Sequence, residues 1–179
     1  QFQAEDSDPE GVGLADFRKP EREAIGSFVK EVDGGVLVMG GISGTGKTHL
    51  LRRLSLDEDF GYISLIGVKD FSIGGIEDSL NSNGETRVLL LDESCLMTTL
   101  EADLIDRVIS QLLEKYRHIV LAGGGMGYTS QEQTDLICES LPVGKFPIRT
   151  HSFPFKTLND RQTAESIEVA PVFAYGNNS

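Results

Sequence analysis

A glycine-rich stretch of eight residues constrains the fold of this chain more than any other feature of its sequence. Residues 41–48 read G-I-S-G-T-G-K-T and fit the pattern G-x-x-x-x-G-K-[ST] at every fixed position. A continuous apolar run at 36–39 precedes the stretch, and a helical pattern at 49–54 follows it. Glycines let such a loop curl with its backbone N–H groups inward, and the helix start adds its positive end. The sequence therefore predicts an anion-binding loop between a buried strand and a helix.

The side chains at the end of this loop suit a nucleoside triphosphate. Lys47 can reach the β- and γ-phosphates, and the Thr48 hydroxyl can ligate Mg²⁺. His49 comes next, and we interpret its side chain as a packing or surface group rather than a catalytic one. No N-K-x-D string, the kind that reads guanine, is present, which favours ATP over GTP. The residues expected to bind the nucleotide are Gly41, Ile42, Ser43, Gly44, Thr45, Gly46, Lys47, Thr48 and His49.

A pair of acids ends a second apolar run. Residues 88–93 read V-L-L-L-D-E, and the carboxyl ends of strands are where an open parallel sheet binds its ligands. We predict that Asp92 belongs to the Mg²⁺ shell, directly or through water. Glu93 is the predicted catalytic base, which polarises a water aimed at the γ-phosphate. Lys47 is the second predicted catalytic residue, because its charge stabilises the negative charge that develops on the phosphates.

Short apolar runs alternate with helical patterns along the whole chain. Continuous runs at 36–39, 88–91 and 118–122 are typical of strands buried on both faces. Weaker strand patterns lie at 62–66 and 146–153, and helical patterns lie at 20–32, 49–54, 74–80, 104–116 and 131–140. This alternation predicts an α/β fold, a three-layer sandwich whose mainly parallel sheet has helices on both faces.

The length and composition of the chain are typical of a single folded domain with flexible termini. We expect a flexible acidic leader at 1–16, a core at 17–155, and a short helix with a frayed tail at 156–179, so that a lid domain is absent or rudimentary. Because the chain opens with Gln1 rather than methionine, we expect it to be part of something longer. No apolar run approaches the roughly 20 residues that span a bilayer, and no secretory signal is visible.

The net charge and the number of cysteines indicate which partners and which compartment to expect. With 16 basic and 28 acidic residues the formal net charge is −12, which disfavours non-specific nucleic-acid binding because neutralising phosphates requires a basic face. The two cysteines, Cys95 and Cys138, are too few for a disulfide framework, and no second Cys or His lies at metal-ligand spacing from either of them. We therefore expect reduced thiols and a cytoplasmic location.

These residues resemble the P-loop ATPases whose second motif carries a catalytic glutamate, especially the AAA+ and STAND-type modules. The string G-T-G-K-T-H-L at 44–50 is similar to that of bacterial replication-initiator and helicase-loader ATPases. Arg22 and Glu23, opening a helix within 17–32, are similar to the entry segment that packs near the adenine in AAA+ and STAND proteins. The strings E-S-L, G-K-F and S-F-P-F between 139 and 155 resemble the last core strand of archaeal-type AAA ATPases. The resemblance implies an ATPase with Mg²⁺, and a protein partner or oligomer that supplies an activating residue.

The chain departs from that family at two positions that affect turnover. The fourth strand of such proteins usually ends in Asn, Ser or Thr, which helps to orient the attacking water, whereas 122–125 read A-G-G-G here, with Thr129 and Ser130 as distant substitutes. Lys145 stands where the family usually has an arginine, so no trans-acting arginine finger is expected there. Arg161, in a helical pattern at 157–169, is either a phosphate sensor or, more simply, an exposed helix residue. Slow hydrolysis is therefore expected.

Three functions remain open on the sequence. The first is an ATP-binding, slowly hydrolysing module that acts as a switch in a larger protein or assembly. The second is a small-molecule or nucleotide kinase, for which Arg149, Lys156 and Arg161 offer the only basic lid. The pair of acids at 92 and 93 argues against it, because a kinase must exclude water. The third is a non-hydrolysing nucleotide-binding scaffold or nucleic-acid-binding module.

Overall fold

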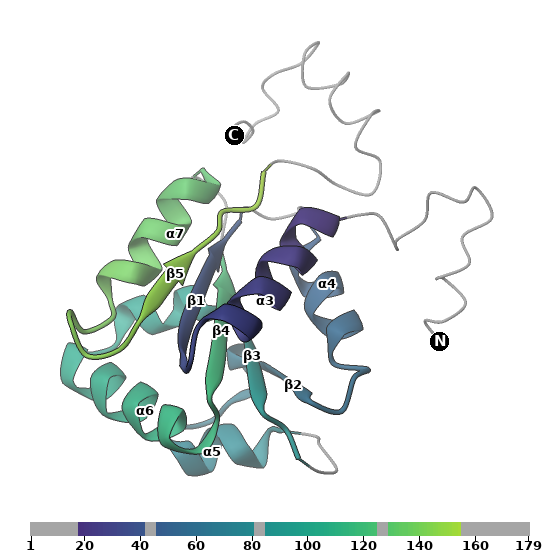
Figure 1. Cartoon of the computed structure of the whole chain (residues 1–179). Helices are drawn as coiled ribbons and strands as arrows, with labels where there is room; N and C mark the ends of the chain where they lie inside the picture. The colour runs from purple at the N-terminus through teal and green to yellow at the C-terminus, as the bar shows by residue number, and fades with distance from the viewer. Residues whose placement is uncertain (1–17, 42–45, 81–84, 125–128, 155–179) are drawn as a thin grey trace.

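A five-stranded sheet, parallel throughout, forms the centre of the molecule. The computed structural model describes residues 18–41, 46–80, 85–124 and 129–154, and Figure 1 shows how their elements are arranged. The strand order is β2-β3-β4-β1-β5. The strands are β1 (Gly35–Gly40), β2 (Phe60–Ser64), β3 (Val88–Asp92), β4 (His118–Gly123) and β5 (Ile148–Thr150).

Helices cover both faces of this sheet. Figure 1 shows α3 (Lys19–Glu31) and α4 (Lys47–Leu54) on one side. The helices α5 (Ile73–Asp78), α6 (Ala102–Lys115) and α7 (Ser130–Glu139) pack on the other side. Two short 3₁₀ helices, η1 (Leu65–Gly67) and η2 (Ser94–Thr99), follow β2 and β3. The three-layer α/β sandwich predicted from the sequence is therefore confirmed.

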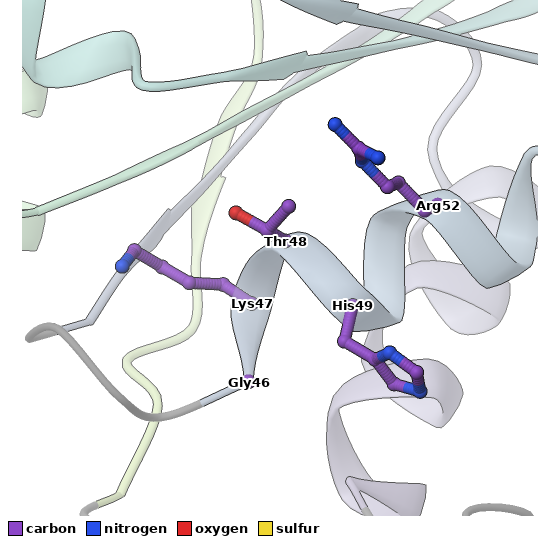
Figure 2. A pocket seen from close by; sticks show the side chains of 5 residues that line it. All are labelled: Gly46, Lys47, Thr48, His49 and Arg52. Atoms are coloured by element: carbon purple, nitrogen blue, oxygen red, sulfur yellow. The ribbon is translucent and has the colours of Figure 1, made fainter.

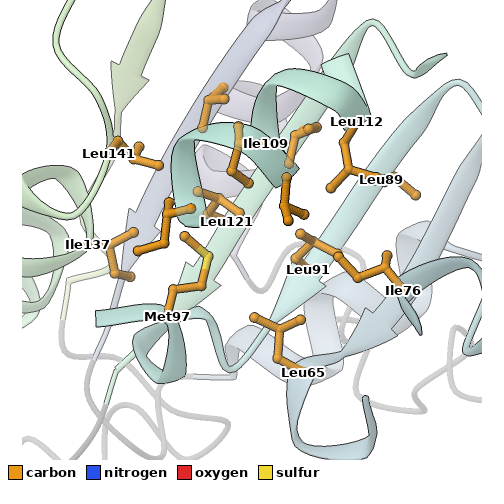
Figure 3. Packing of buried hydrophobic residues seen from close by; sticks show 14 of the residues in the cluster. Leu65, Ile76, Leu89, Leu91, Met97, Ile109, Leu112, Leu121, Ile137 and Leu141 are labelled. Atoms are coloured by element: carbon orange, nitrogen blue, oxygen red, sulfur yellow. The ribbon is translucent and has the colours of Figure 1, made fainter. Parts of the chain in front are cut away.

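The apolar runs divide their side chains between the two faces, because successive residues of a strand point to opposite sides. The larger cluster, part of which Figure 3 shows, takes alternate residues of the central strands and packs them against α5, α6 and α7. The intervening residues pack against α3 and α4. In β3, for example, Leu89 and Leu91 belong to the first cluster, whereas Val88 and Leu90 belong to the second. Strands buried in this way read as continuous apolar runs.

Most predicted elements are present, with ends that differ from the predicted ones by no more than three residues. The strand predicted at 62–66 ends at Ser64, because the Ser64 side chain accepts the Ile66 N–H at 3.3 Å and starts η1. The strand predicted at 146–153 contains three residues, although the backbone N–H groups of His151 and Phe153 continue to donate to β1. The predicted leader at 1–16 and the tail at 156–179, with Lys156 and Arg161, lie outside the described residues.

The strand register places the two candidate motifs side by side at the carboxyl ends of the strands. Gly40 at the end of β1 is level with Gly123 at the end of β4, and Leu91 of β3 is level with Leu121. The strand β4 therefore separates the glycine-rich loop from the acidic pair, and all three strands end together. Within the described parts of the chain, no helix has the length and apolar character needed to cross a membrane.

Candidate nucleotide site

The glycine-rich loop is anchored where it leaves β1. The Gly41 N–H donates to the Gly123 carbonyl at 3.0 Å, and the Gly40 N–H donates to the Thr134 hydroxyl of α7 at 2.9 Å. Gly40 has no room for a side chain, because a Cβ atom there would lie 2.2 Å from the Thr134 nitrogen. Of the predicted nucleotide-binding residues, 42–45 lie outside the described residues. The anchored start of the loop is thus fixed to both β4 and α7.

The loop ends at the first turn of α4, where Lys47 and Thr48 meet the acidic pair. Gly46 has φ of 88° and leads directly into the helix. Lys47 is 7% exposed; burial lowers its pKa, and the nearby charges of Asp92 and Glu93 counteract part of that effect. The Thr48 hydroxyl donates to Asp92 Oδ2 at 2.6 Å. The fold therefore brings together the four residues that the sequence predicts to hold phosphate, metal and water.

A cavity of about 440 Å³ opens beside this turn, lined by Gly46, Lys47, Thr48, His49 and Arg52. Figure 2 shows Thr48 and Arg52 on one side of α4 and the His49 ring pointing away from them. His49 is half-buried and belongs to the lining of the cavity, so its interpretation as a packing or surface group stays a prediction. A volume of this size falls within the usual range of small-molecule pockets.

Glu93 occupies a backbone conformation that is uncommon for a residue with a side chain. Its φ and ψ are 60° and 37°, in the left-handed region, which costs a non-glycine residue roughly 1–2 kcal/mol. The turn redirects the chain from β3 into η2, and the Ser94 hydroxyl secures it by donating to the Leu91 carbonyl at 2.8 Å. Backbone strain of this kind gathers at functional sites. The half-buried Glu93 thus stands at the carboxyl edge of the sheet.

The end of β4 has no space for the polar side chain that the resemblance leads one to expect. A Cβ atom on Gly123 would lie 2.7 Å from the Ser94 nitrogen, and one on Gly124 would lie 1.7 Å from the Gly41 carbonyl oxygen. Of the two suggested substitutes, Thr129 caps α7, because its side chain accepts the Glu132 N–H. Ser130 is buried at the start of α7.

Two basic residues singled out in the sequence lie away from the loop. Lys145 pairs with Asp106 of α6 at 3.1 Å and precedes β5, at the opposite edge of the sheet from Lys47. Arg149 is level with Leu37, in the first half of β1, and pairs with Glu31 of α3 at 3.2 Å. The position of Arg149 does not agree with a basic lid over a transferred phosphoryl group, and the other two residues suggested for that lid, Lys156 and Arg161, lie outside the described residues.

A buried ionic cluster joins the start of α3 to the segment after β5. Arg18 and Glu21 are 2% and 1% exposed, and their side chains lie 3.5 Å apart. Glu21 also bonds the His151 ring at 2.7 Å, while Arg18 donates to the Pro154 carbonyl and lies over the Phe153 ring. For the start of α3, the family resemblance had pointed to Arg22 and Glu23, but Glu23 is exposed. The buried acid is Glu21.

Sequence reasoning missed three residues that support the site. Tyr62 donates its hydroxyl to Asp92 at 2.7 Å. Two causes raise the pKa of Tyr62 to about 12: its burial, which is the larger, and its hydrogen bond to Asp92. Arg52 lies over the Tyr62 ring, and Thr134 holds Gly40. Each looks ordinary in its strand or helix pattern, so only the packing reveals it.

The residues present fit a magnesium ion bound together with a phosphate chain. Across the described ranges, no group of three or more His, Cys, Asp or Glu could hold a metal by itself. The Thr48 hydroxyl and the Asp92 carboxylate nevertheless offer hard oxygen donors side by side. Mg²⁺ prefers such oxygens and usually takes the rest of its shell from water and substrate phosphates.

Comparison with known proteins finds likeness in structure but not in sequence. No family model matches the chain, and no curated protein matches it. AMPPCP-bound DnaA from Aquifex aeolicus is similar over 91% of this chain, with 15% identity and a TM-score of 0.45. The Thermotoga maritima RuvB Holliday junction branch migration motor is similar over 96%, with 21% identity and a TM-score of 0.45. Bacteroides Pif1 bound to single-stranded DNA is similar over 76%, with 13% identity and a TM-score of 0.41. The matches cover 54%, 56% and 41% of those chains, so this chain spans about half the length of the first two and about two fifths of the third.

Proposed function

We propose that this chain is an ATP-binding P-loop module that hydrolyses ATP slowly and acts as a nucleotide-driven switch in a larger protein or assembly. One observation supports it most: Lys47 and Thr48, at the end of the glycine-rich loop, meet Asp92 and Glu93 at the end of β3. Phosphate binding, metal binding and water activation each need one of these residue types. Lys47 and Thr48 line the cavity, and Asp92 bonds the Thr48 hydroxyl.

The chemistry divides among these side chains. Lys47 and the loop N–H groups stabilise the negative charge of the phosphates. Thr48 and Asp92 would hold Mg²⁺, which neutralises charge on the phosphate oxygens when it is bound. Glu93 accepts a proton from a water in line with the γ-phosphate, so that the water oxygen attacks phosphorus as the bond to ADP breaks. ADP and inorganic phosphate leave.

A nucleotide-binding module without turnover is the second candidate, and one observation favours it. The close contact of Gly123 with η2 excludes a water-orienting side chain at the end of β4. The kinase alternative is less well supported, because Arg149 pairs with Glu31 and lies level with the first half of β1.

Two measurements separate the candidates. Titration of the chain with ATP and with GTP, each with and without Mg²⁺, should give Mg²⁺-dependent binding that favours ATP. Phosphate release should then be followed with ATP alone and with candidate acceptors. Slow release with ATP alone supports the ATPase, tight binding without release supports the scaffold, and consumption that requires an acceptor supports the kinase. Absence of nucleotide binding would contradict the proposal as a whole.

A further inference from the structure

Asp92 is held by three hydrogen bonds, one of which has no counterpart in the sequence motifs. Its Oδ2 accepts the Thr48 hydroxyl at 2.6 Å and the Tyr62 hydroxyl at 2.7 Å. Its Oδ1 accepts the N–H of Glu93 at 2.9 Å. The side chain is 1% exposed, so these donors replace the water that would otherwise surround it. Tyr62 is the donor that comes from outside the two motifs.

The sheet register explains why Tyr62 reaches this carboxylate. In the β2–β3 pair, Tyr62 is level with Leu90, two residues before Asp92, and therefore lies on the same face of the sheet. Its ring packs with the cluster beneath α3 and α4. The hydroxyl extends along that face to the end of β3, where it meets Asp92.

Arg52 holds the tyrosine from the other side. It follows Thr48 by one turn of α4, and its guanidinium lies 5.2 Å from the centre of the Tyr62 ring, within the range of a cation–π contact. Arg52 also lines the cavity beside Lys47 and Thr48. Successive turns of one helix thus contact Asp92 directly through Thr48 and indirectly through Tyr62.

We propose that Tyr62, held by Arg52, is a positioning residue for Asp92 and determines how strongly Mg²⁺ supports nucleotide binding; this inference rests on the proposed function. A carboxylate oxygen has two lone-pair sites, and both sites of Oδ2 are used by hydroxyl donors. Oδ1 accepts one hydrogen bond and has a second lone-pair site, through which it would join the shell of a bound Mg²⁺. Tyr62 therefore fixes which oxygen of Asp92 is available.

The Tyr62→Phe variant tests this directly, because it removes one hydroxyl and keeps the ring beneath Arg52. The binding of a fluorescent ATP analogue should be measured as Mg²⁺ is titrated, and again in EDTA. Partners that orient metal ligands typically contribute 10–100-fold to metal affinity, so the apparent Mg²⁺ dissociation constant should rise about tenfold. Affinity for the analogue in EDTA should stay at the wild-type value, a separation that general loss of structure would not produce.

Tyr116→Phe is the matched control. The Tyr116 hydroxyl also donates to a carboxylate, that of Glu77 at 2.8 Å. Tyr116, however, directly follows α6 and precedes the start of β4, so it lies near the amino ends of the strands, away from Asp92. This variant should leave the Mg²⁺ dependence unchanged. If Tyr62→Phe does not fold, Arg52→Lys decides, because it keeps the charge and loses the planar contact. Its Mg²⁺ constant should rise about two- to fivefold.

The outcomes separate this inference from the function on which it rests. Wild-type Mg²⁺ dependence in Tyr62→Phe, or in Arg52→Lys if the first variant does not fold, would overturn the role of Tyr62 and leave ATP binding established. An equal loss of affinity with and without Mg²⁺ would also overturn it, because a positioning role acts through the metal. If the unaltered chain binds no nucleotide, both proposals fail together.

Discussion

Gly123, at the end of β4, packs so closely against the first turn of η2 that a Cβ atom on it would lie 2.8 Å from the Cys95 nitrogen. The same Cβ atom would lie 3.3 Å from the carbonyl carbon of Glu93, the proposed catalytic base. The glycine is therefore a packing requirement of this site. It also excludes a water-orienting side chain at this position, which is the structural reason for the slow hydrolysis that we propose.

Gly123→Ser should destabilise the protein without accelerating hydrolysis. The added side chain must displace the backbone of η2, and overpacking of this kind costs about 1–3 kcal/mol. Urea unfolding measures the loss. Gly26→Ala is the control, because Gly26 lies within α3 with no atom within 4 Å of the added Cβ, and it should gain about 0.5–1 kcal/mol. A Gly123→Ser variant of wild-type stability and higher turnover would contradict the packing argument.

Glu93→Gln should keep ATP binding and lose turnover. The amide retains the shape of the side chain but cannot accept the proton of the attacking water, and general base catalysis contributes about 10²–10⁴-fold. Phosphate release at saturating Mg²⁺ and ATP measures the loss, with Glu114→Gln, an exposed change on α6, as the control. If Glu93→Gln hydrolyses ATP at the parent rate, the water-activating residue lies elsewhere.

The unaltered chain should hydrolyse ATP at well below about 1 s⁻¹, the low end of typical enzyme turnover. An arginine supplied in trans contributes about 10³–10⁵-fold to such reactions. Lys145 pairs with Asp106 at the far edge of the sheet, and Arg52 contacts Tyr62. Phosphate release should be measured while the oligomeric state is monitored. Rapid multi-turnover hydrolysis by a demonstrated monomer would contradict this expectation.

The buried pair of Arg18 and Glu21 should make stability fall in acid. Burial raises the pKa of Glu21, but the His151 hydrogen bond and the Arg18 charge outweigh it and bring the pKa below its ordinary value of 4.5. Ionised Glu21 therefore stabilises the fold above about pH 4.5, and this contribution is lost as the pH falls through the lower, folded-state pKa.

The Glu21→Gln variant tests that linkage. It should be about 3 kcal/mol less stable than the wild type at neutral pH, because it removes the carboxylate that pairs with the buried Arg18 charge. The free energy of unfolding should be measured from neutral pH down to about pH 3, and the gap between the two proteins should narrow in acid. A gap that stays constant over that range would show that Glu21 does not titrate in the way described.

The sequence predicts the sheet and the meeting of its two motifs well, because both depend on local patterns. Apolar runs such as 88–91 identify strands buried on both faces, and the carboxyl ends of parallel strands must share one edge of the sheet. Lys47 and Asp92 are therefore brought together by topology, which the sequence already indicates.

The supporting residues depend on packing between elements far apart in the chain, and no local pattern reports that. Tyr62 reaches Asp92 through the β2–β3 register, and Thr134 reaches Gly40 across 94 residues. The helix η2 was also missed, since its six residues, S-C-L-M-T-T, have no helical periodicity. It explains why Gly123 must be a glycine.

Calorimetric titration with ATP and Mg²⁺ should be carried out on the wild type, on Lys47→Ala and on Lys145→Ala. Lys47 is a buried cation at the end of the glycine-rich loop, whereas Lys145 is a half-exposed lysine that pairs with Asp106 near the amino ends of the strands. We expect Mg²⁺-dependent binding that is unchanged in Lys145→Ala and abolished or greatly weakened in Lys47→Ala. Equal affinity in all three proteins would contradict nucleotide binding at the glycine-rich loop.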